Sequence, residues 1–125
     1  MNGCIFVMGG RNKSFVHLNS IEMYDPNTNK WQSISSPSTA SLVAQSTLPT
    51  PLEWFGSVVV GDSIIVMGGH DGQLKANSMC WDVKINKWRN LPDMPHALVG
   101  FACSVMGDKI YVAGKCSNLS SDLYT

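Results

Sequence analysis

The sequence is poor in charge and contains no long apolar run. Charged side chains make up 14% of its 125 residues, and the formal net charge is +0. A chain without a basic excess has no electrostatic attraction to nucleic acid or to an anionic membrane, so we expect neither as a partner. Its apolar runs have the length of strands, well below the roughly 18 residues of a membrane span, and no basic segment leads into an apolar one at the amino terminus.

The cysteines lack the spacing of metal and redox sites. No two of them are separated by two residues, which is the spacing that zinc ribbons and redox motifs need. Each lies in or beside an apolar run, where a free thiol behaves as a small buried hydrophobic group. We therefore expect reduced, structural cysteines and a cytoplasmic location. The four are Cys4, Cys80, Cys103 and Cys116.

Motifs for catalysis and for cofactors are also missing. There is no G-X-S-X-G elbow, and the glycine pairs at 9–10 and 68–69 lack the spacing that cradles a phosphate. His17, His70 and His96 all fall in predicted loops, so a three-histidine metal site is conceivable, but no spacing of carboxylate and histidine supports it. We interpret them as ordinary exposed side chains, and we predict no enzyme activity, no catalytic residue, no cofactor and no metal.

A repeated stretch carries the main structural information. Ile5 to Gly10 reads Ile-Phe-Val-Met-Gly-Gly, and Ile64 to Gly69 reads Ile-Ile-Val-Met-Gly-Gly. The first copy is followed by Tyr24-Asp25 and Trp31, and the second by Trp81-Asp82 and Trp88, so seven residues separate the two aromatic positions in each. A degraded third copy runs from Ile110 to Lys115 and reaches Tyr124.

The hydrophobic pattern predicts short strands throughout. No stretch of ten or more residues has a 3.6-residue period, so we predict no helix. Turn chemistry separates the strands, as in Asp-Pro-Asn-Thr-Asn at 25–29 and Gly-Asp-Ser at 61–63. The predicted strands cover residues 4–8, 21–25, 30–32, 55–60, 64–67, 79–83, 88–91, 101–106 and 110–113.

The predicted strands group into repeating units. Residues 55–91 contain four strands and form a complete unit, residues 3–33 match it without the first strand, and residues 98–125 match a truncated copy. Residues 34–54 are rich in Ser, Thr and Pro and form an inserted loop. A loop of this length is either a poorly ordered insertion or a contact element, and the sequence leaves both open.

The repeat resembles that of the kelch family, and the resemblance covers almost the whole chain. The glycine pairs begin 59 residues apart across the insertion, and the third copy follows 46 residues after the second, close to the kelch period of about 50. The Leu-Pro-X-Met-Pro connection at 91–95 is similar to that of kelch-like adaptor proteins. The resemblance implies an all-β fold: an incomplete β-propeller of four-stranded antiparallel blades, with fewer than three blades present and aromatic residues packed between them.

The blade count predicts a piece of a longer protein. Propellers close with about four to eight blades, and a repeat unit cannot bury its lateral faces alone. A piece of this length leaves Tyr24 and Trp31 on one side, or the 101–113 hairpin on the other, without a neighbour. We therefore expect a fragment of a longer chain or a truncated gene product, which in isolation self-associates or is only marginally stable.

The resemblance also implies a protein-interaction module. Kelch-like proteins recruit substrates to a cullin-based ubiquitin ligase, other kelch proteins bind actin, and some propellers are enzymes. Scattered polar residues in the loops favour the module over an enzyme. Leu52-Glu53-Trp54 and Leu98-Val99-Gly100 stand where family members often carry an arginine and a serine, which argues against an acidic peptide ligand. By position, the candidates for contact with a protein partner are Arg11, Asn12, His17, His70, Asp71, Gln73, Lys75 and His96.

Overall fold

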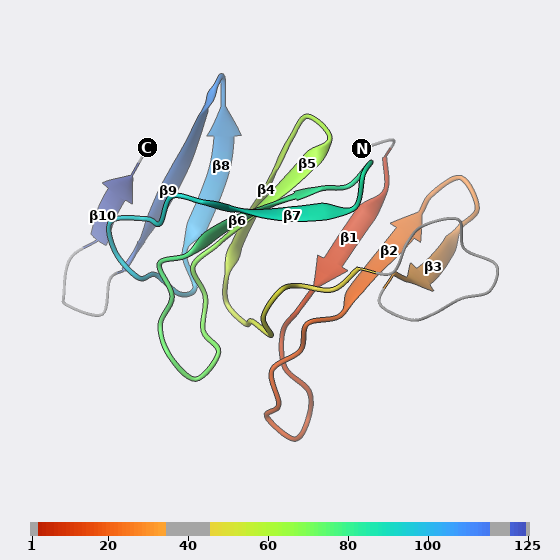
Figure 1. Cartoon of the computed structure of the whole chain (residues 1–125), viewed down its shortest axis with the longest axis horizontal. Coiled ribbons are helices and arrows are strands. Elements are labelled where there is room, and N and C mark those ends of the chain that lie inside the picture. Colours follow the sequence, from red (N-terminus) through yellow and green to blue (C-terminus); the bar gives the residue numbers. More distant parts are fainter. Residues whose placement is uncertain (1–2, 35–45, 116–120, 125) are drawn as a thin grey trace. The chain divides into compact units, whose positions relative to one another are not determined.

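The computed structural model describes residues 3–34, 46–115 and 121–124, and these residues contain ten strands and no helix. Every strand pairs antiparallel with its neighbour in the sequence, giving one four-stranded sheet and two three-stranded sheets (Figure 1). The chain divides into a first unit, Met1–Glu53, and a second unit, Trp54–Thr125. No helix that could cross a bilayer occurs within the residues described. The all-β prediction is confirmed.

The first unit contains the sheet β1-β2-β3, formed by Ile5–Met8, Ile21–Asp25 and Lys30–Ser33. The predicted turn at 25–29 joins β2 to β3. There the backbone N–H of Asn27 donates to Asp25 Oδ1 at 2.8 Å, and Asn29 adopts a φ of 55°. Asparagine tolerates this left-handed conformation better than most residues, which explains its place in the turn.

Part of the inserted loop packs against the first unit. Residues 35–45 lie outside the described residues, but three backbone hydrogen bonds tie the segment after them to the first unit: Ser46 N to Ile34 O, Leu48 N to Asn19 O, and Leu52 N to Leu18 O. Leu48 and Leu52 are buried, as is Ile21 of β2. Residues 46–53 therefore contribute to the apolar interior of this unit.

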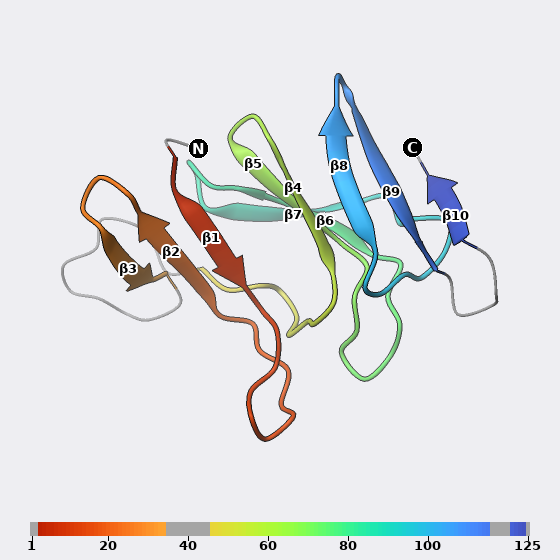
Figure 2. The same cartoon turned by 180° about the vertical axis from the view of Figure 1, so that it is seen from behind.

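The second unit contains two sheets. In one, β4 (Gly56–Val60), β5 (Ser63–Met67), β6 (Ser78–Asp82) and β7 (Lys87–Leu91) lie in chain order. In the other, β9 lies between β8 and β10 (Figure 2). That sheet consists of β8 (Ala102–Met106), β9 (Lys109–Lys115) and β10 (Ser121–Tyr124).

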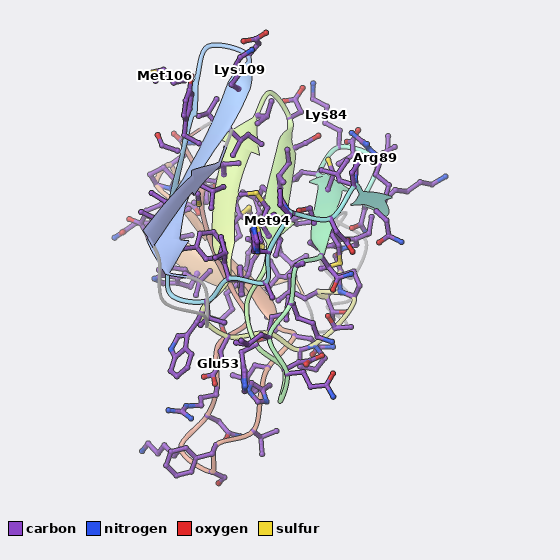
Figure 3. The ribbon with its side chains drawn as sticks, turned by 90° about the vertical axis from the view of Figure 1, so that its left-hand side faces the viewer. Glu53, Lys84, Arg89, Met94, Met106 and Lys109 are labelled. Carbon is purple, nitrogen blue, oxygen red and sulfur yellow. The ribbon has the colours of Figure 1, made fainter. Side chains whose placement is uncertain are left out.

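Two-residue loops close two hairpins of the second unit. Gly61 opens the turn between β4 and β5 with a φ of 58°, and Gly107 opens the turn between β8 and β9 with a φ of 64°. Glycine at the first central position suits the turns that match the twist of antiparallel strands. Met106 and Lys109 flank the second of these turns, at the tip of its hairpin (Figure 3).

Phe101 packs the two sheets of the second unit together. Strands β4 and β8 lie beside each other, and Phe101 contacts a buried cluster that includes Met67 and Val112. A side chain at Gly56 or at Gly114 would overlap with the Phe101 side chain. These glycines are therefore needed for close packing against an aromatic ring.

The third copy differs from the first two at the position of the glycine pair. It has Gly114-Lys115 there, and strand β9 continues through both residues to its end at Lys115. Gly114 stays in the strand and leaves room for Phe101, so no turn forms at this position.

The repeated aromatic residues face each other across neighbouring strands. Tyr24 and Trp31 are register partners with ring centroids 5.3 Å apart, and Trp81 and Trp88 are register partners at 5.8 Å. Each pair is anchored through the following turn: Tyr24 Oη donates to Asn29 Oδ1 at 2.7 Å, and Trp81 Nε1 donates to Asn86 Oδ1 at 3.0 Å. Trp81 is fully buried, whereas Trp31 is 56% exposed.

Candidate partner-binding loops

Each glycine pair ends a strand with the same backbone conformation. Gly9 and Gly10 have φ values of 64° and 91°, and Gly68 and Gly69 have 62° and 95°. Residues with a Cβ rarely adopt such a succession of left-handed conformations, so the position favours glycine. The pairs turn the chain out of β1 and β5 into the two loops that contain most of the predicted contact residues.

A ring of three backbone hydrogen bonds closes the base of the first loop, residues 11–17. Gly10 N donates to Leu52 O at 2.7 Å, Leu52 N donates to Leu18 O at 3.1 Å, and Leu18 N donates to Gly10 O at 2.8 Å. Because only main-chain groups take part, the ring places no demand on the side chains of the loop above it.

The second loop, residues 70–75, has the same ring at its base. Gly69 N donates to Leu98 O at 2.8 Å, Leu98 N donates to Lys75 O at 3.2 Å, and Lys75 N donates to Gly69 O at 2.9 Å. The repeat therefore preserves the base of the loop and varies the residues at its tip.

The backbone of the first loop is held by Asn12, one of the predicted contact residues. Asn12 Oδ1 accepts hydrogen bonds from Ser14 N at 2.9 Å and Val16 N at 3.1 Å, and its carbonyl accepts one from Phe15 N at 3.0 Å. The Asn12 side chain thus stabilises a tight tip from within.

Glu53 joins two other predicted contact residues at the base of the first loop. Its carboxylate, only 6% exposed, lies 3.2 Å from Arg11 Nε and 3.2 Å from His17 Nε2 (Figure 3). A buried carboxylate needs such partners, because an uncompensated charge is costly away from water. The sequence interpretation missed Glu53, whose role depends on a contact across 36 residues of chain.

The tip of the first loop presents an apolar surface that the sequence interpretation also missed. Phe15 is 72% exposed with a φ of 62°, and Val16 is exposed beside it. The Arg11 guanidinium carbon lies 4.8 Å from the centre of the Phe15 ring, in cation–π contact. The sequence signal that could have found this surface is the Phe15-Val16 pair in a loop whose other residues are polar.

The second loop is held by its own charged and polar side chains. Asp71 Oδ1 accepts a hydrogen bond from Gln73 N at 3.2 Å, and Asp71 Oδ2 lies 3.0 Å from Lys75 Nζ. The hydrogen bond from Lys75 is the main reason that the pKa of Asp71 is below its ordinary value. Gly72 has a positive φ of 107°, and its N–H donates to His70 Nδ1 at 3.3 Å.

Trp54 lies at the edge of the second loop. Its indole is 55% exposed, and its ring centroid is 6.3 Å from that of His70 with the planes tilted by 41°. His96, the last predicted contact residue, is an exposed residue of the connection between β7 and β8. The structure thus joins Arg11 to His17 and Asp71 to Lys75, and it adds Trp54 to the second loop.

The described cysteines have the features of structural thiols. Cys4, Cys80 and Cys103 form no disulfide. The Cys103 thiol donates to the carbonyl of Ser57 at 3.4 Å, and its burial raises its pKa. A raised pKa lowers the fraction of reactive thiolate at neutral pH.

The sheets and loops together define a class of protein. Repeated antiparallel sheets of three or four strands are the blades of a β-propeller. In the first two copies, a fixed glycine turn leads into a loop of different sequence.

The comparison with protein families identifies which propeller repeats these are. The family model described as the kelch motif matches residues 1–38 and 55–95, so the chain belongs to the kelch-repeat family. Its all-β sheets are kelch blades of an incomplete propeller, as the sequence predicted.

Several curated proteins are similar to this chain. Kelch-like protein 7 of Rattus norvegicus is 33% identical over 104 residues, which cover 82% of this chain and 16% of that protein. Beta-scruin of Limulus polyphemus is 29% identical over 127 residues, covering 94% and 12%. A putative F-box/kelch-repeat protein of Arabidopsis thaliana is 39% identical over 94 residues, covering 72% and 26%. The chain spans only a small part of each relative.

Proposed function

We propose that the chain is a protein-interaction module without enzyme activity, and that the loops after the glycine pairs contact the partner. The observation that carries this proposal is the shared backbone ring beneath two loops of different sequence. A constant base with variable tips suits recognition, because the scaffold fixes the position of side chains that are free to differ. Membership of the kelch family supports the same interpretation.

We further propose that the module selects substrates for a cullin-based ubiquitin ligase, as the substrate-recognition part of a kelch-like adaptor in the cytoplasm. Similarity to Kelch-like protein 7 supports this assignment. Cys4, Cys80 and Cys103, the described cysteines, form no disulfide, which is compatible with an intracellular location. An actin- or cytoskeleton-binding kelch protein is the alternative. Beta-scruin, a relative that is not named as kelch-like, matches 94% of the chain, whereas Kelch-like protein 7 matches 82%.

Loop exchange tests the proposed contact surface. In one variant residues 12–16 are replaced by glycine and serine, in another residues 70–74, and partners are captured from cell extract with each. As a control, residues 107–108 are changed. They form the turn between β8 and β9 and belong to neither loop. We expect partners of the wild-type chain to be lost with the loop variants and kept with the control. Equal capture by all variants would contradict the proposal.

Two assays separate the adaptor from the cytoskeletal alternative. The full-length protein should co-precipitate a cullin, and its depletion should raise the abundance of a captured partner. A cytoskeletal module should instead co-sediment with purified actin filaments without a cullin. Co-sedimentation that is lost in the loop variants would replace the adaptor assignment with the alternative.

A further inference from the structure

Trp54 has a backbone conformation that does not suit its side chain. Four described residues other than glycine have a positive φ: Phe15, Asn29, Trp54 and Asn86. Asparagine visits this region readily, whereas a bulky residue there is an outlier. Trp54 has a φ of 55°, so its side chain imposes strain that the surrounding fold must overcome.

The repeat shows which residue this position accommodates without strain. Leu52, Trp54 and Phe55 correspond in sequence to Leu98, Gly100 and Phe101 of the next copy. Gly100 has a φ of 57°, almost identical to that of Trp54, and no atom would lie within 4 Å of an added Cβ. The Gly100 N–H also donates to the Trp54 carbonyl at 2.9 Å. The surrounding fold therefore imposes this backbone conformation at both positions, and glycine adopts it without strain.

Burial in the apolar interior does not explain why a tryptophan occupies position 54. More than half of the Trp54 side chain is exposed, and its described ring contact is with His70 of the second loop. Leu74 of the same loop is also exposed. A strained residue that leaves a large aromatic surface in water is typical of functional sites rather than of cores.

The charges beside Trp54 indicate the chemistry of its contact. In the second loop the carboxylate of Asp71 and the ammonium of Lys75 compensate each other at 3.0 Å. A charged partner group would therefore meet a neutral pair here, with no net attraction. The indole and Leu74 provide apolar surface beside it, which a partner can bury.

We propose that Trp54, supported by His70, is an anchor residue that is buried against an uncharged apolar segment of a protein partner. This inference rests on the proposed interaction function and names the residue that contributes most to it. Tryptophan is enriched among such anchors because it buries a large rigid surface with few rotatable bonds.

The test uses Trp54→Gly, which removes the indole and keeps the backbone shape seen at Gly100. Peptides are selected from a random phage-displayed library on the wild-type 125-residue chain, and their affinities are measured for the wild type and the variant. The matched control is Trp31→Phe, which alters another exposed tryptophan on β3. We expect apolar or aromatic peptides without a charged consensus, and a loss of affinity of at least about tenfold in Trp54→Gly only.

Several results would overturn the inference. Unchanged affinity in Trp54→Gly, a selected consensus rich in acidic or basic residues, or a library that yields no binder would each do so. If the 70–74 exchange abolishes peptide binding while Trp54→Gly does not, the interaction function stands and the anchor assignment falls. If the 12–16 exchange, the 70–74 exchange and Trp54→Gly all leave capture of natural partners unchanged, the proposed function itself falls. Circular dichroism of both single variants checks that the sheets are intact.

Discussion

Two substitutions at position 54 separate backbone strain from side-chain contacts. Trp54→Gly and Trp54→Ala both remove the indole, so they lose similar contacts and differ mainly in backbone preference. At a φ of 55° a Cβ costs roughly 1–2 kcal/mol. Glycine avoids this cost, but its greater freedom in the unfolded chain destabilises the folded state by roughly 0.4–1 kcal/mol relative to alanine. We predict that Trp54→Gly has a free energy of unfolding about 1 kcal/mol higher than Trp54→Ala.

Gly100 provides an independent measure of the same strain. It has a matching φ of 57° and open space around its Cα, so Gly100→Ala should be destabilised by backbone strain without a clash. We expect a loss of about 1 kcal/mol there as well.

The free energies of unfolding of the wild type, Trp54→Gly, Trp54→Ala and Gly100→Ala are measured by urea denaturation. The transition is followed by far-ultraviolet circular dichroism, because this signal arises mainly from the backbone rather than from the tryptophan removed. All are compared at one protein concentration, since self-association would shift the transitions. The reasoning is refuted if Trp54→Ala is as stable as Trp54→Gly. It is also refuted if Gly100→Ala matches the wild type, because the two positions share one conformation.

Three further predictions concern other contacts. Glu53→Gln removes a buried charge from its two partners, and we expect faster amide exchange in residues 11–17 and a loss of about 1–3 kcal/mol; unchanged exchange would contradict this. Gly114→Ala would clash with Phe101 and should cost about 1–3 kcal/mol, visible as a lower urea midpoint, whereas an unchanged midpoint would refute the packing. Because the hydrogen bond from Lys75 holds the folded pKa of Asp71 below its ordinary value, Asp71 should contribute stability above that ordinary value and lose it as the pH falls through the folded pKa. Amide exchange in the second loop, corrected for the intrinsic exchange rate at each pH, should show this loss in the wild type and not in Asp71→Asn, which removes the carboxylate beside Lys75.

The strands were predictable because their determinants are local. Alternating or continuous apolar runs, Asp-Pro and Gly-Asp turns and the repeated glycine pairs each act over a few residues. The repeat then supplied the fold class, since the predicted strands of 55–91 match β4 to β7 closely. The packing role of Gly114 was not predictable, because it depends on Phe101, which lies just before β8 and packs against it.

The candidate site was less accessible to sequence reasoning. Loop position alone led to Arg11 and His17, but the structure shows both turned toward Glu53, which the sequence interpretation did not include. Phe15 and Trp54 were missed because their exposure and left-handed backbone are set by the surrounding fold and not by their neighbours in sequence. The assignment of contact residues therefore stays a prediction, now with two aromatic residues added.

The backbone ring beneath each loop also bears on how such proteins diversify. It spans seven residues between Gly10 and Leu18 and five between Gly69 and Lys75, yet its hydrogen bonds are equivalent. Insertions, deletions and substitutions above the ring leave those bonds intact, since amide groups occur in almost every residue. The ring therefore allows natural variation or protein engineering to introduce new recognition sequences in the loop while the sheet below stays unchanged.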